Sequence, residues 1–89
     1  MNAVWKYTLN TEDNLEIDLP VGSKILSVQE QFGEPQMWVL VNPDNPVYEI
    51  PKFRLAGTGH PIKESDISFI GTFQLYGGSF VGHLFEINE

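Results

Sequence analysis

Hydrophobic and polar residues alternate with a period of two along much of the chain, and no stretch shows the spacing of an amphipathic helix. Trp5, Tyr7 and Leu9 are separated by polar residues, and residues 14–19 repeat the alternation with apolar side chains at the odd positions. This pattern is typical of strands that bury one face.

A hairpin is predicted where the strand at 25–31 meets the strand at 37–41 across a four-residue loop at 32–35. The second strand is apolar on both faces, with methionine and valines at the odd positions and Trp38 and Leu40 at the even positions. A strand of this kind is expected to be covered on both sides, either by the same chain or by a partner subunit.

An extended segment is predicted at 47–55, and Pro51 either bulges this strand or places it at a sheet edge. A glycine-rich loop at 56–61 and one helical turn at 63–66 are expected to follow. A second hairpin is predicted to join 69–75 to 80–87 across 76–79. Together these elements give about seven short strands. We therefore expect one domain over residues 1–89, all-β or β-dominated α+β, built as a small antiparallel sandwich or barrel-like domain.

The composition of the chain argues against several classes of protein. The 89 residues contain no cysteine, so neither a disulfide nor a thiolate ligand contributes. Twelve acidic and five basic side chains give a net charge of −7, which opposes binding to a nucleic-acid duplex. The sequence has no apolar run long enough to span a membrane and no signal peptide at its start, so we expect a cytoplasmic protein without a membrane partner.

Six segments carry a resemblance to a known family. They are WKY at 5–7, KILSVQ at 24–29, MWVLV at 37–41, GTGHPI at 57–62, IGTFQ at 70–74 and VGHLFE at 81–86. In this order they resemble a family of small phage- and prophage-encoded proteins of unknown function. The resemblance implies a phage setting and brings no catalytic residue with it.

The sequence offers little support for catalysis. No nucleophile motif surrounds a serine, and no histidine spacing is typical of a metal site, so we expect no catalytic residue, no metal and no cofactor. His83 shares its parity with Val81, Phe85 and Ile87, and we expect it to be a hydrogen-bonded histidine on an apolar, core-facing side of its strand.

Two features are candidate binding sites. The first is an anion site whose backbone and side-chain donors come from Arg54, Gly57, Thr58, Gly59, His60 and Lys63. The same glycines are also compatible with a tight turn and no ligand. The second is Tyr76 at a hairpin tip, which is a candidate anchor for a protein partner.

The function that fits these observations is that of a non-enzymatic phage accessory protein, which binds and neutralises a host protein as a counter-defence or host-takeover inhibitor. A first alternative is an oligomeric sponge that sequesters a small, nucleotide-like anionic signalling molecule. A second is a small structural protein of the virion. Because one short chain has difficulty covering both faces of residues 37–41, we expect a homodimer or a larger homo-oligomer.

Overall fold

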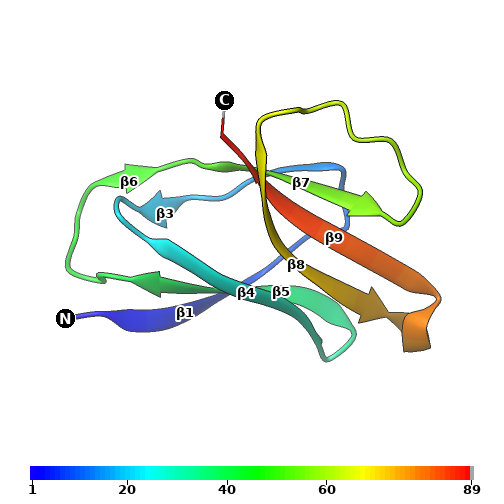
Figure 1. Cartoon of the computed structure of the whole chain (residues 1–89). Helices are drawn as coiled ribbons and strands as arrows, with labels where there is room; N and C mark the ends of the chain where they lie inside the picture. Colours follow the sequence, from blue (N-terminus) through cyan, green and yellow to red (C-terminus); the bar gives the residue numbers. More distant parts are fainter. Residues whose placement is uncertain (89) are drawn as a thin grey trace.

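The computed structural model describes residues 1–88, and almost all of its regular structure is β (Figure 1). The strands in this part of the chain are β1 (Ala3–Thr8), β2 (Asn14–Glu16), β3 (Leu19–Pro20), β4 (Lys24–Gln31), β5 (Glu34–Val41), β6 (Tyr48–Glu49), β7 (Lys52–Gly57), β8 (Ile67–Leu75) and β9 (Phe80–Ile87). A single 3-10 turn, Tyr76–Gly78, joins β8 to β9. The prediction of an all-β domain is confirmed.

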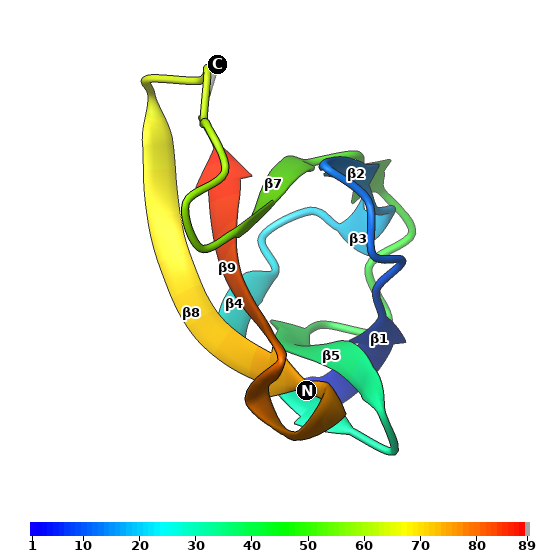
Figure 2. The same cartoon turned by 90° about the vertical axis from the view of Figure 1, so that its right-hand side faces the viewer.

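The strands form three antiparallel sheets. One sheet has the order β1-β5-β4, the second has the order β2-β7-β9-β8, and β3 pairs with β6 in a short third sheet. Seen end-on, the strands surround a common interior (Figure 2). The predicted sandwich or barrel-like arrangement therefore describes the molecule well.

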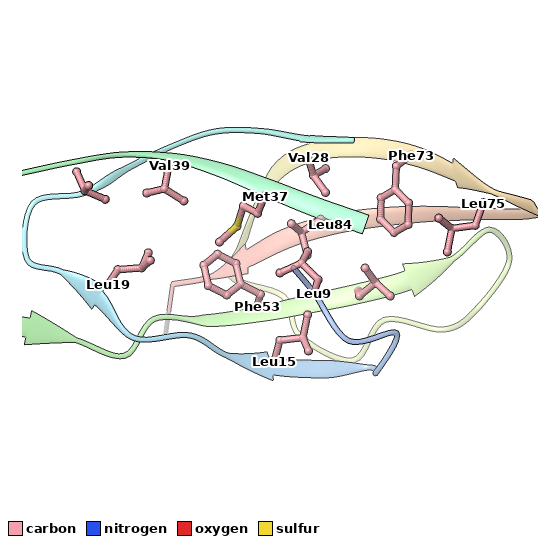
Figure 3. Packing of buried hydrophobic residues seen from close by; sticks show 12 residues of the cluster. Leu9, Leu15, Leu19, Val28, Met37, Val39, Phe53, Phe73, Leu75 and Leu84 are labelled. Atoms are coloured by element: carbon pink, nitrogen blue, oxygen red, sulfur yellow. The ribbon is translucent and has the colours of Figure 1, made fainter. Parts of the chain in front are cut away.

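The core lies between the two larger sheets and follows the alternation of the sequence. Met37, Val39 and Val41 of β5 are completely or almost completely buried, and Met37 points toward Phe53 and Leu84 of the opposite sheet (Figure 3). The buried hydrophobic cluster comprises Leu9, Leu15, Leu19, Val28, Met37, Val39, Val41, Phe53, Leu55, Phe73, Leu75 and Leu84. Burial of these side chains is the main source of stability in a chain without disulfides.

The other face of β5 is open to solvent. Trp38 and Leu40 point away from the core and are half-buried, and Val4, which lies opposite Leu40 on β1, is 54% exposed. The prediction that both faces of this strand are covered is confirmed for the inner face, whereas residues 1–88 of one chain cover the outer face only in part.

Two glycines allow close packing. A side chain at Gly82 would lie 2.5 Å from the ring of Phe73 on the neighbouring strand of the same sheet, and one at Gly71 would lie 2.9 Å from Val28 Cγ1. Gly71 is on β8 and Val28 is on β4, so glycine allows the edge of one sheet to approach the edge of the other.

The region around Pro51 differs from its prediction. We expected Pro51 to bulge one strand or mark its edge, but the strand is split into β6 and β7. The facing segment at 14–19 is split as well, because β2 pairs with β7 while β3 pairs with β6. Proline donates no ladder hydrogen bond, so both partners lose their regular pairing at the same place.

Two shorter predictions were wrong. The first hairpin has a two-residue loop, Phe32-Gly33, because Glu34 and Pro35 already pair with β4. No helical turn forms at 63–66. The carbonyl groups of Pro61 and Asp66 accept hydrogen bonds from Arg54 and from the Asn88 N–H, so this segment is held by partners outside itself.

Candidate functional site

Arg54 is the centre of the predicted anion site, and its side chain is only 9% exposed. Its Nη1 donates to the carbonyl of Asp13 at 3.0 Å and its Nη2 donates to the carbonyl of Pro61 at 2.7 Å. The carboxylates of Asp13 and Glu64 each lie 3.5 Å from the guanidinium. Arg54 therefore clamps the segment before β2 and the connection after β7 to its own strand.

Two backbone N–H groups of the glycine-rich loop already donate hydrogen bonds to carbonyl groups of the same chain. The N–H of Thr58 donates to Val81 at 3.1 Å, and the N–H of His60 donates to Gly57 at 3.0 Å. A side chain at Gly57 would lie 2.9 Å from the His60 ring, so this glycine makes room for the imidazole. Gly59 has φ +87, which a tight turn requires.

The structure brings Arg54, His60 and Lys63 around one hollow of about 290 Å³, but it also brings carboxylates there. The complete lining is Asp13, Asn14, Arg54, His60, Pro61, Lys63 and Glu64. Asp13 and Glu64 oppose a small anion at this place. Anion binding at the loop stays a prediction, and the contacts of Arg54 explain its presence without a ligand.

Thr58 is directed elsewhere. Its Oγ1 lies 2.7 Å from Nε2 of His83, whose Nδ1 lies 2.9 Å from Oγ1 of Thr72. His83 is thus hydrogen-bonded as expected, but its predicted orientation was wrong. Gly82 and Leu84 are the buried residues of β9, so His83 lies on the outer face of its sheet. The parity of Val81, Phe85 and Ile87 misled because those side chains are half-buried on that outer face.

The first hairpin tip carries an aromatic residue that the sequence analysis did not single out. Phe32 has φ +56, Gly33 has φ +81, and the Phe32 side chain is 87% exposed. Lys6 Nζ lies 6.0 Å from the centre of the Phe32 ring and donates to Gln31 Oε1 at 2.8 Å. The signal in the sequence was an aromatic directly before glycine between two alternating segments, where a two-residue loop demands positive φ at both positions.

The second tip has the same character. Tyr76 has φ +53, Gly77 and Gly78 also have positive φ, and Tyr76 is 75% exposed. The Ser79 Oγ and N–H donate to the Tyr76 carbonyl and close the turn. Tyr76 therefore lies at a hairpin tip as predicted, and its role toward a partner stays a prediction.

The two tips lie side by side. Both hairpins end at the same end of the molecule in the two views (Figures 1 and 2). Residues of both tips line one hollow of about 450 Å³, to which Gly33 contributes from the first tip and Tyr76 from the second. We call this surface, comprising Phe32, Gly33, Tyr76, Gly77 and Gly78, the tip surface.

Backbone strain distinguishes the tip surface from an ordinary pair of turns. A bulky residue at positive φ is a backbone outlier and costs about 1–2 kcal/mol, and asparagine or glycine would fit better. Burial in the core does not offset this cost, because both rings are exposed. Strained backbone conformations cluster at functional sites, and aromatic side chains are frequent anchors of protein interfaces.

The part of the chain that the structure describes contains neither a cluster of metal-ligating side chains nor a membrane-spanning helix. Within residues 1–88, no three side chains of the metal-ligating types come together. No helix among these residues has the length and apolarity needed to cross a membrane.

The chain belongs to a family described as a domain of unknown function (DUF7352), whose sequence pattern matches residues 1–89. No curated protein and no solved structure matches the chain.

Proposed function

We propose that this member of the family is a non-enzymatic binding module that attaches to a protein partner through the tip surface. The observation that carries the proposal is the exposure of Phe32 and Tyr76, at 87% and 75%, in left-handed backbone conformations on adjacent hairpins. A few anchor residues near the centre of a contact, many of them aromatic, supply most of the binding energy of a typical interface.

The size of the molecule is compatible with this role. A stable protein complex needs about 800 Å² from each partner, and the described residues expose 5517 Å² in total. The hairpins are anchored in the core through Val28 and Met37 on one side and Phe73 and Leu75 on the other. Rigid anchoring reduces the entropy lost on binding.

The resemblance to phage- and prophage-encoded proteins supports a host protein as the partner. In that setting, occupying a functional surface of a host factor is enough to neutralise it, and no catalytic group is needed. This is a counter-defence or host-takeover inhibitor that acts in the cytoplasm of the host cell.

Self-association is a second proposal and has a separate basis. The outer face of the β1-β5-β4 sheet carries an apolar group, Trp38, Leu40 and Val4, which lies beside Lys6 and Lys24 and is partly exposed in the single chain. We propose that a second copy covers it, giving a homodimer or a larger homo-oligomer. Light scattering after size exclusion should give a mass well above 10.1 kDa for the wild type, and Leu40→Lys should lower it to the monomer value. A monomer mass for the wild type at all concentrations would contradict the proposal.

The sponge for a nucleotide-like anion keeps one supporting observation, which is that Arg54, His60 and Lys63 share a hollow. Calorimetry with cyclic and linear nucleotides tests it, with His60→Ala and Lys63→Ala as variants. Binding that both variants weaken would favour the sponge. If the wild type binds no nucleotide, or if both variants bind as well as the wild type, this alternative fails.

Capture of partners from host lysate tests the main proposal. The baits are the wild type, the double variant Phe32→Asn/Tyr76→Asn, which removes both rings and suits positive φ, and the control Ile50→Asn. Ile50 is 59% exposed on the connection between β6 and β7, outside the tip surface. We expect the wild type and the control to retain the same protein and the double variant to lose it. Equal retention by all three baits would overturn the proposal.

A further inference from the structure

The hollow between the two hairpin tips has a chemistry of its own. Its lining consists of Glu30, Gly33, Gln74, Tyr76, Gly77 and Gly78. One side chain is a carboxylate, one is an amide and one is an aromatic ring, and the three glycines add no side chain that would fill the space. No lysine or arginine belongs to this lining.

The carboxylate is held in place. Glu30 Oε2 accepts a hydrogen bond from the N–H of Gly33 at 2.7 Å, so the carboxylate is fixed beside the first tip. Among the described residues no hydrogen bond involves Glu30 Oε1, which leaves that oxygen available to a ligand. A carboxylate that is already oriented loses little entropy when it binds a cation.

The other two groups favour the same kind of ligand. Gln74 Oε1 lies 3.2 Å from the position that a Gly78 side chain would take, so the amide oxygen lies directly against the second tip. Tyr76 contributes a ring with a negative π face. A carboxylate, an amide oxygen and a π face are all acceptors, and a cationic donor complements all three.

We propose that the hollow between the tips binds an arginine side chain of the partner protein. A guanidinium is planar, stacks on an aromatic ring and donates to a carboxylate and an amide oxygen at the same time. The inference rests on the proposed function, because it specifies which group of the partner enters the hollow between the two hairpin tips. The charge of −7 on this chain favours approach of such a basic segment.

Other ligands fit less well. An anion would be repelled by Glu30. An apolar side chain would remove Glu30 Oε1 and the Gln74 amide from water without giving them a hydrogen-bond partner, which is costly. A lysine ammonium satisfies the carboxylate but cannot match the planar arrangement of ring and acceptors.

The probes are blocked tripeptides, Gly-Arg-Gly, Gly-Lys-Gly and Gly-citrulline-Gly, titrated into the intact protein. Citrulline keeps the shape of arginine without its charge. We expect the arginine peptide to shift the NMR amide signals of Gly33, Gly77 and Gly78 in a saturable way, the lysine peptide to bind more weakly and the citrulline peptide to cause no shift. Equal shifts with arginine and citrulline, or none with either, would overturn the inference.

Matched variants locate the site. Glu30→Gln keeps an acceptor for the Gly33 N–H and removes the charge, and it should weaken arginine binding by about tenfold. Tyr76→Asn should weaken it as well, whereas Tyr76→Phe should preserve it because the ring stays. Ile50→Asn is the control, since Ile50 is exposed, lies outside the tip surface and does not line the hollow. Arginine binding that survives Glu30→Gln and Tyr76→Asn unchanged would also overturn the inference.

The failures of the two proposals can be told apart. If tip variants lose the captured protein while the arginine peptide shifts no signal, the arginine site is refuted and the protein-binding function stands. If tip variants capture the same protein as the wild type, the protein-binding function is refuted whatever the peptide does.

Discussion

The glycine-rich turn at 57–60 and the one at 76–79 have similar compositions and opposite environments. In the first, Gly57 is buried, it lies under the His60 ring, and the clamp of Arg54 holds the following segment. In the second, no atom comes within 4 Å of a side chain placed on Gly77, and the aromatic residue before it points to solvent. Gly57 serves close packing in the first turn, whereas Gly77 serves backbone conformation in the second.

The difference affects how each turn relates to function. The donors of the first turn are used within the chain, so its polar residues stabilise the fold. The second turn, together with the Phe32-Gly33 tip, exposes strained aromatic residues that contribute little to the core. A glycine-rich motif therefore says little about ligand binding until the partners of its backbone groups are known.

The largest effect is expected when the turn at 57–60 loses the Arg54 contacts that hold the segment after it. Arg54→Met should lower the free energy of unfolding by about 2–4 kcal/mol, because it leaves the partly buried Glu64 without its cationic partner and the carbonyl of Pro61 without a donor, while the carbonyl of Asp13 keeps only the Leu55 N–H. Urea denaturation measures the change. Lys52→Met on the same strand is the matched control, since Lys52 is exposed, and it should change stability by less than about 0.5 kcal/mol. If both variants are equally stable, Arg54 is free to serve a ligand.

A smaller effect separates the two uses of glycine. Gly57→Ala should cost about 1–3 kcal/mol because the new Cβ meets the His60 ring at 2.9 Å. Gly77→Ala should cost about 1–2 kcal/mol for a different reason, its φ of +66. A double-mutant cycle with His60→Ala distinguishes them: the cost at Gly57 should fall when the imidazole is absent, and the cost at Gly77 should not change. Equal coupling of both glycines to His60 would contradict this explanation.

The sequence predicted much of the fold because a period of two is a strong local signal. The core residues of β5, the strand β1 and both hairpins followed from alternation and turn residues. The splitting of residues 14–19 did not, because it depends on Pro51, which lies about 30 residues further along the chain and interrupts the partner strand.

The candidate site was less predictable for a similar reason. Arg54, His60 and Lys63 line one hollow, but Asp13 comes from a distant segment and changes the electrostatics of that hollow. The orientation of His83 was missed because both faces of β9 carry apolar residues, so parity alone does not identify the core side. Phe32 was hidden inside a loop predicted to be four residues long.

The smallest expected effect is the change in the free energy of unfolding when the aromatic residues of the tip surface are replaced, and the test lies in whether that change is a gain or a loss. Phe32→Asn and Tyr76→Asn should each raise the free energy of unfolding by about 0.5–1 kcal/mol, because asparagine tolerates positive φ and little ring burial is lost. Phe69→Asn is the control: Phe69 is also exposed, at 62%, but it lies in β8 and its ring packs edge-on against Phe85 at 5.6 Å, so asparagine there should destabilise.

Urea denaturation of the three variants should therefore give two gains and one loss. A gain in stability that accompanies loss of the captured partner would show that the chain keeps its tip aromatics for recognition at the expense of the fold. Destabilisation by the tip substitutions would instead assign the two rings a role in the fold and remove the strain argument for the tip surface.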